Sequence, residues 1–235
     1  TPGKGKILSQ QYLDFAINRE ARFSLLVPAQ RHVTISDLPD VQAVENLHWG
    51  GCFKRFISDA DEIGNAHINR DGQYLLSEDP LILSIIDVIG DAWPLSVSFE
   101  QIVQNTLLPE EPDNHREKVE TALARLFKPR QDGLLFSNGP SAYNLATSAS
   151  IEPIPGAFAF NEINDEFTGH NLWGESLALT RVEYEFLKKG VHIDDDTSVS
   201  TFLSLRDKGA LCGNARAWRK AFQTCLKFDN AAVLN

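Results

Sequence analysis

The sequence predicts an α+β fold that is mainly helical: a winged-helix core, preceded by a helix and strand segment and followed by a helical module. Three observations support this fold class. Helix-start signals precede apolar periodic segments, turn dipeptides flank two short apolar runs near residue 140, and a strand, three helices and a hairpin follow in the order of a winged helix. We place the three parts at residues 1–70, 71–150 and 151–235.

Length and composition set the class of protein. The chain has 235 residues, of which 43% are hydrophobic and 23% charged, ordinary values for a globular protein. Its longest apolar stretch, residues 81–89, contains Ser84 and Asp87 and is too short to span a membrane. No signal-peptide pattern follows the N-terminus, and the odd number of cysteines, three, suits a reducing compartment. We therefore expect a cytoplasmic protein without a membrane span.

The N-terminal segment combines a helix with strands. Residues 10–22 have apolar side chains at helical spacing, namely Tyr12, Leu13, Ala16 and Ile17. Residues 23–27, which end at Pro28, and the aromatic-rich residues 47–57 indicate strands.

The predicted core begins with a strand over residues 73–76 and a buried helix. Asp79 is a natural N-cap, and Pro80 suits the first position of a helix over residues 80–92. Because this helix is apolar on most sides, we expect it at the centre of the core.

Two further helices and a hairpin complete the predicted winged helix. Ser98 and Gln101 form a capping box, and Asn114 with Glu117 forms a weaker capping pair. The helix after Asn114 has an apolar face at positions i, i+3, i+4, i+7 and i+8: Val119, Ala122, Leu123, Leu126 and Phe127. Turn dipeptides then flank residues 134–136 and 143–146, which predicts a β-hairpin.

The C-terminal part is predicted to be helical. Residues 151–176 show no clear period and indicate a linker. Thr180 and Glu183 form a second capping box, which opens a helix that ends at Gly190. Asn214 caps a last helix with one apolar stripe: Trp218, Ala221, Phe222, Cys225 and Leu226.

The net charge of −10 is unevenly distributed. Residues 71–115 contain nine acids and no Lys or Arg, whereas residues 116–130 hold five basic residues against two acids. The predicted wing, residues 133–149, has no basic residue that could contact phosphates. Nucleic acid is therefore not the partner we expect, although a winged-helix DNA-binding regulator remains the alternative function.

The sequence contains no recognisable catalytic, cofactor-binding or metal-binding motif. It lacks the Gly-rich turn of a nucleotide or S-adenosylmethionine site, a P-loop and a G-x-S-x-G elbow. We therefore predict that this chain is not an enzyme and binds no cofactor. A hydrolase with unrecognised sites is a third possibility, which would need several ionisable groups to converge in a pocket.

Several residues have both a functional and a structural interpretation. His192 with Asp194, Asp195 and Asp196 is either a metal cluster or a solvated acidic loop. Cys225 is either a nucleophile or a small core residue, and we interpret His48 as structural. The aromatic residues of the predicted strand either line a peptide groove, and so form a candidate binding surface, or pack in the core: Trp49, Phe53 and Phe56.

The run from Tyr12 to Leu26 resembles the signature Y-L-D-F-x-x-N-R-x-F-R-x-T-L-L of the predicted methyltransferase regulatory domain. That domain follows the catalytic domain in bacterial S-adenosylmethionine-dependent methyltransferases, including protein-lysine methyltransferases. The matching residues include Asp14, Phe15, Asn18, Arg19 and Arg22, to which the resemblance assigns a structural or interdomain role. Ala21 and Phe23 depart from the signature. Residues 79–102 look like the family's second block, and residues 180–190 are more distantly similar to its C-terminal tail.

The resemblance implies a non-catalytic module that regulates a methyltransferase or selects its substrate by binding protein. Its implied partner is a methyltransferase catalytic domain in cis or in trans, and the chain would be a fragment or partner of such an enzyme. An acidic surface would suit a basic, lysine-bearing protein substrate by electrostatic complementarity.

Overall fold

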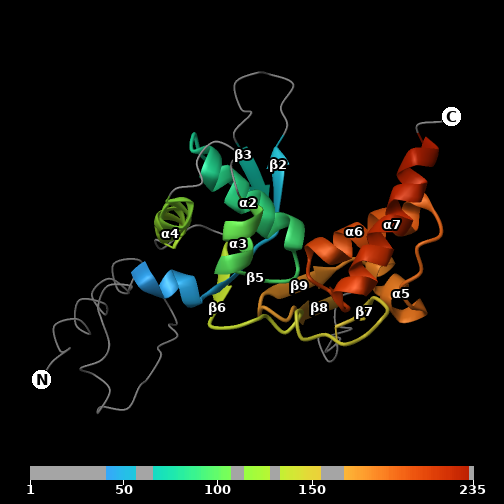
Figure 1. The fold of residues 1–235 in the computed structure, drawn as a ribbon. Helices are drawn as coiled ribbons and strands as arrows, with labels where there is room; N and C mark the ends of the chain where they lie inside the picture. Colours follow the sequence, from blue (N-terminus) through green and yellow to red (C-terminus); the bar gives the residue numbers. More distant parts are fainter. Residues whose placement is uncertain (1–40, 57–65, 107–113, 128–132, 155–166, 233–235) are drawn as a thin grey trace, which may run out of the picture. The chain divides into compact units, whose positions relative to one another are not determined.

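The computed structural model describes residues 41–56, 66–106, 114–127, 133–154 and 167–232 (Figure 1). All of these described residues belong to one compact unit of the chain. This unit is a mixed α+β structure with two hydrophobic cores. We call the part around the first core, residues 41–137, the first lobe, and the part around the second, residues 141–232, the second lobe. Within the described ranges, no helix is both long and apolar enough to cross a membrane.

The first lobe contains four helical segments and six short strands among its described residues. In chain order these are η2 (Val41–Asn46), β1 (His48–Gly50), β2 (Phe53–Phe56), β3 (Ala66–Asn69), β4 (Tyr74–Leu76), α2 (Pro80–Ala92), β5 (Val97–Ser98), α3 (Phe99–Asn105), α4 (His115–Leu126) and β6 (Leu135–Ser137). The predicted strands near residues 47–57 and 73–76 are thus confirmed as β1, β2 and β4.

All three helices of this lobe begin where the sequence predicts, and two of the three predicted side-chain caps are formed. The Asp79 side chain accepts a hydrogen bond from the Leu81 N–H at 3.0 Å, with Pro80 in the first turn of α2. Ser98 and Gln101 form the reciprocal capping box at α3. The pair predicted at Asn114 is wrong, because Asn114 adopts a left-handed conformation with φ of 67° and makes no side-chain cap.

The strands of the first lobe form two antiparallel sheets. One has the order β2-β3-β4, and α2 packs against it (Figure 1). The other has the order β5-β1-β6, in which His48 of β1 lies opposite Ser98 on one side and Ser137 on the other. The strand at the centre of the second sheet therefore comes from the chain before the three helices.

This strand order contradicts the predicted hairpin. Residues 134–136 do contribute a strand, β6, but its partner is β1, and residues 142–145 form turns instead of a second strand. The polar side chains of these turns bind distant backbone groups, as described below, so they are unavailable for a two-stranded ribbon. The mixed α+β class is confirmed, whereas the winged helix is not.

The core of the first lobe follows the apolar periodicity of the sequence. Three side chains of α2, Ile85, Ile86 and Ile89, are fully buried. The predicted face of α4 is confirmed, since Val119, Ala122, Leu123 and Leu126 all pack in the same core.

The second lobe has small strands and three helices in its described part. In chain order these are β7 (Glu152–Pro153), β8 (Phe167–His170), β9 (Ser176–Leu179), α5 (Arg181–Lys189), α6 (Asp196–Asp207), β10 (Leu211–Cys212) and α7 (Ala215–Ala232). β8 and β9 form a hairpin that the sequence did not reveal, and β10 pairs with β7. The predicted linker over residues 151–176 thus contains strands.

The helix signals of the second lobe are confirmed. Thr180 and Glu183 form the capping box of α5, and Gly190 follows its last turn with φ of 92°. Asn214 accepts a hydrogen bond from the Ala217 N–H at 2.9 Å. The α7 side chains Trp218, Ala221 and Cys225 are buried as predicted, while Leu226 at the edge of the stripe is 57% exposed.

Two core substitutions test the first lobe. Because Ile86 and Leu123 are fully buried, we expect Ile86→Ala and Leu123→Ala each to lower the free energy of unfolding by about 2–5 kcal/mol. Leu145→Ala, at a leucine that is 68% exposed, is the control and should cost much less. Chemical denaturation that gives less than about 1 kcal/mol for both core variants would contradict this packing.

A buried carboxylate in the second lobe gives a pH-dependent prediction. Burial raises the pKa of Glu183, but its bonds to Lys208, Ser204 and the Thr180 N–H outweigh burial, and the net pKa is lowered. A lowered folded-state pKa stabilises the fold above the unfolded pKa, and this stability is lost as pH falls through the folded-state pKa. We expect Glu183→Gln to destabilise by about 1–3 kcal/mol at pH 7 and by progressively less below about pH 4. Urea denaturation at several pH values measures this loss of stability. A loss that is the same at every pH would refute this assignment.

Candidate functional site

The two lobes meet where two helix ends cap each other. The Trp93 indole Nε1 donates to the carbonyls of Arg206 and Asp207 at the end of α6, both at 3.0 Å. In return, the Arg206 guanidinium donates to the carbonyls of Trp93, at 3.0 Å, and Gly90, at 3.3 Å, at the end of α2. The last carbonyls of a helix lack intrahelical partners, and a cation is favoured there. Each lobe therefore satisfies a helix end of the other.

A second set of contacts lies beside this capping pair. The Trp173 ring stacks on Trp93, with centroids 6.4 Å apart, and its Nε1 donates to the Pro94 carbonyl at 3.0 Å. A Cβ added at Gly50 would come within 2.5 Å of the Trp173 ring, so this close approach requires glycine. Trp173 thus packs directly on strand β1 of the first lobe.

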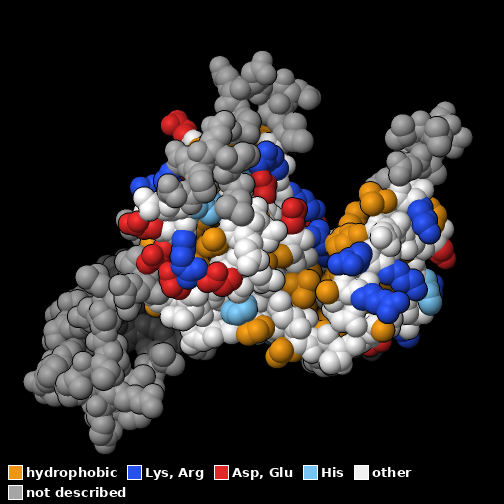
Figure 2. All heavy atoms as spheres, in the orientation of Figure 1, with side chains coloured by type: hydrophobic (Ala, Val, Ile, Leu, Met, Phe, Trp, Pro, Cys, Tyr) orange, Lys and Arg blue, Asp and Glu red, His pale blue; other side chains and the backbone are white. Residues whose placement is uncertain are grey.

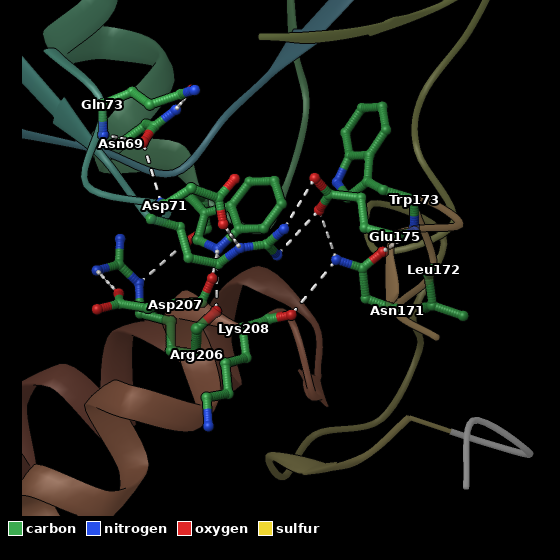
Figure 3. A network of polar contacts seen from close by, with 12 residues as sticks. Asn69, Asp71, Gln73, Asn171, Leu172, Trp173, Glu175, Arg206, Asp207 and Lys208 are labelled. Carbon is green, nitrogen blue, oxygen red and sulfur yellow. Dashed lines mark hydrogen bonds and ion pairs between the residues drawn. The ribbon is translucent and has the colours of Figure 1, made fainter. Parts of the chain in front are cut away.

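A polar network extends the junction (Figure 3). Arg70 donates to both carboxylate oxygens of Glu175 at 3.1 Å. The Asn171 amide donates to Glu175 at 2.7 Å and to the Lys208 carbonyl at 3.3 Å. Bidentate arginine–carboxylate pairs are geometrically specific, so this network orients β8 and β9 toward β3.

The turns over residues 141–146 bind both lobes. The Asn144 amide oxygen accepts bonds from the backbone N–H and the hydroxyl of Ser96, both at 2.8 Å, and from the Ser141 hydroxyl at 2.6 Å. The Tyr143 hydroxyl donates to the Gly209 carbonyl and accepts from the Leu172 N–H. These long-range bonds explain why the segment forms turns instead of the predicted strand.

A hollow of about 280 Å³ lies at the junction, lined in part by Cys52, Lys54 and Asp207. Lys54 and Asp207 form an ion pair across it. Burial, reinforced by the charge of Asp207, raises the pKa of the Cys52 thiol to about 11. A thiol with this pKa is protonated near neutral pH, so Cys52 has no nucleophilic thiolate. We interpret this hollow as a structural part of the junction.

A larger groove of about 560 Å³ lies between α5 and the start of α6. The exposed Val182 and the half-buried Phe186 give it an apolar wall. Glu185, Asp194 and Asp195 line it with carboxylates, while Arg181 and Lys189 lie at the two ends of α5. Hydrogen bonds from Ser198 lower the pKa of Asp195, so this carboxylate is ionised at neutral pH. The groove can hold a side chain that has both an apolar part and a cationic end.

The residues predicted as a binding surface do not form one exposed face. Trp49 is fully buried and Phe53 is 6% exposed, so both belong to the core. Phe56 is half-buried, and its ring contacts Tyr74 edge-on at 5.3 Å. The family-motif residues lie outside the described part of the chain: Asp14, Phe15, Asn18, Arg19 and Arg22.

The remaining candidate residues from the sequence are His192 with its neighbouring acids, Cys225 and His48. No group of three His, Cys, Asp or Glu in the described ranges could hold a metal ion, and the Asp195 near His192 caps α6. Cys225 is buried in the core of the second lobe. Burial lowers the pKa of His48, which lies in strand β1.

Two of the cations of α4, the helix expected to read DNA in a winged helix, are paired within the protein. Arg116 donates to Glu100 at 2.6 Å and to Glu45 at 3.2 Å, and Arg125 lies 3.7 Å from Asp79. A cation already paired with a carboxylate contributes less to phosphate binding. These contacts do not support the DNA-binding alternative.

Sequence reasoning missed the residues that form the junction. Arg206, Tyr143 and Glu175 carried no motif, because their partners lie 29 to 116 residues away along the chain. One local signal was available: Arg206 lies in the last turn of a helix that ends before Gly209, where a cation is favoured.

Comparison with known proteins gives a likeness in fold alone. The sequence matches no family model and no curated protein. The structure of PKMT2 from Rickettsia typhi superposes with a TM-score of 0.55 at 13% identity, covering 77% of this chain and 38% of that chain. The structure of the same protein in complex with AdoHcy gives a TM-score of 0.51 at 13% identity, covering 85% and 41%. The chain spans about two fifths of the PKMT2 structures.

This likeness corrects the prediction that the chain is not an enzyme. Both of the structures described above are those of PKMT2, a protein lysine methyltransferase, and one of them has AdoHcy bound. The prediction rested on the missing Gly-rich loop. A motif that is absent from the sequence does not exclude a methyltransferase-related fold.

The raised pKa of Cys52 predicts low reactivity. We expect iodoacetamide to modify Cys52 slowly at pH 8, where about one thiol in a thousand is ionised, and the rate to rise about tenfold per pH unit toward pH 11. Mass spectrometry of tryptic peptides measures the rate, with glutathione as the exposed reference thiol. Labelling of Cys52 as fast as glutathione at pH 8 would mean that the thiol is not shielded.

Proposed function

We propose that this chain is part of a protein lysine methyltransferase and contributes the region that holds the protein substrate. The observation that carries the proposal is the shared fold with PKMT2, a protein lysine methyltransferase, over most of this chain. AdoHcy, bound in one PKMT2 structure, is what remains of S-adenosylmethionine after methyl transfer. The chain spans about two fifths of PKMT2. We therefore propose for it only substrate binding, as one part of the activity of a larger enzyme.

The groove between α5 and α6 supports the substrate part of the proposal. A lysine side chain has a four-carbon apolar stem and a cationic end. Val182 and Phe186 offer an apolar surface to the stem, and Glu185 or Asp194 offers a carboxylate to the ammonium. Arg181 and Lys189 at the ends of α5 allow a bound segment to carry acids beside its lysine.

The charge of the first lobe also suits a basic protein. Five of its cations form ion pairs within the structure: Lys54, Arg55, Arg70, Arg116 and Arg125. Its exposed acids include Glu78 and Asp91. A surface whose cations are paired and whose acids remain exposed attracts a basic partner over a distance set by the ionic strength.

A peptide titration tests the proposal. The probe is a fluorescein-labelled peptide with three lysines spaced by alanines, and the matched probe has glutamine in place of each lysine. We expect the lysine peptide to bind more tightly in anisotropy titrations, with affinity that falls as salt rises from about 50 to 200 mM.

Variants that replace carboxylates with neutral amides test whether the groove is the binding site. Glu185→Gln with Asp194→Asn should weaken binding of the lysine peptide about fivefold or more, because it removes two carboxylates that face the groove. Glu117→Gln with Glu120→Gln makes the same charge change on α4 and is the control. Equal binding of the two peptides, or equal losses in the two double variants, would contradict the proposal.

A further inference from the structure

Helix α7 has an exposed face that carries four cations. Arg216, Arg219, Lys220 and Lys227 are all exposed, and at the spacing of an α-helix they fall within an arc of about 100°. The opposite side of the helix is buried in the core of the second lobe: Ala217, Trp218, Ala221 and Cys225. Because the core fixes the rotation of the helix, the cations cannot turn away from solvent. We call this face the α7 stripe.

The α7 stripe differs from the paired basic residues of the first lobe. None of its four cations forms an ion pair with a residue in the described ranges. In the first lobe, by contrast, five cations are paired with carboxylates, as noted above. Lys and Arg side chains gather over the second lobe near α7 (Figure 2). In a chain of net charge −10, this local excess of positive charge is unusual.

The stability of the helix does not explain the stripe. Arg216, Arg219 and Lys220 lie in the first two turns of α7, where the helix dipole disfavours cations. Arg216 and Lys220 are also spaced i, i+4, at which like charges repel. No acid lies in the first turn to compensate. The arrangement therefore costs stability in the free protein, and a bound anion would relieve that cost.

We propose that the α7 stripe binds an acidic protein segment that also carries apolar side chains. Charge complementarity requires an anionic partner, and Leu226, which is 57% exposed beside the cations, offers an apolar contact that a phosphate backbone would not use. Since the apolar side of α7 is buried in the protein core, the helix cannot insert that side into a bilayer.

Four probes distinguish the classes of partner, all titrated against the 235-residue chain. The first is a labelled dodecapeptide of glutamates with a leucine at every fourth position, and the second has serine in place of each leucine. The third is a 20-base-pair DNA duplex, and the fourth is a vesicle containing phosphatidylserine. We expect the leucine peptide to bind most tightly and its affinity to fall between about 50 and 200 mM salt. Tighter binding of the duplex or the vesicle, or no peptide binding at about 50 mM salt, overturns the proposal.

Single substitutions test whether the leucine peptide binds at the α7 stripe. Lys220→Glu should weaken binding of the leucine peptide about fivefold, while Lys188→Glu, the same charge reversal on α5, should change it less than about twofold. Leu226→Ser should remove the preference for the leucine peptide over the serine peptide. Circular dichroism confirms that each variant is folded. Equal effects of Lys220→Glu and Lys188→Glu overturn the proposal.

Discussion

The structure depends on the reciprocal capping of two helix ends by Trp93 and Arg206. Each side chain donates to the terminal carbonyls of the helix in the other lobe, so neither end is left with buried, unpaired acceptors. Removal of Arg206 would take the donor from the Trp93 carbonyl, and removal of Trp93 would take the donor from the Asp207 carbonyl. A buried carbonyl without a donor costs more than the bond contributes in water. The constraint therefore joins the folding of the two lobes, which have separate cores.

The contact between the lobes at the capping pair determines which surfaces of the second lobe remain accessible. The junction is occupied by Trp173, the Arg70–Glu175 pair and the turns near Tyr143. The hollow beside Cys52 is crossed by the Lys54–Asp207 ion pair, and its thiol is protonated at neutral pH. The charged side chains that are accessible to a partner lie instead on the surface of the second lobe, away from the junction residues. There the α5–α6 groove offers carboxylates beside an apolar wall, and α7 offers cations without partners in the described structure.

Local signals in the sequence predicted the helices well and the topology poorly. The capping boxes at Ser98 and Thr180 and the apolar face of α4 depend on residues within one or two turns, so the sequence contains all the information. The hairpin prediction was wrong because β6 pairs with β1, about 90 residues earlier, and periodicity does not identify a distant partner. The groove between α5 and α6 could not be predicted for the same reason, since it arises from the packing of two helices. The inference about enzymatic activity failed because it relied on the absence of a motif.

Hydrogen exchange measured by mass spectrometry tests most directly whether the capping pair joins the two lobes. In the wild-type protein, peptides from α2 and α4 and peptides from α6 and α7 should exchange their slowest amides through one common opening, with the same free energy. In Arg206→Met, which keeps most of the apolar stem and removes the donors to Gly90 and Trp93, the lobes should open with different free energies. Wild-type lobes that already open independently, or a variant in which they still open together, would contradict the account.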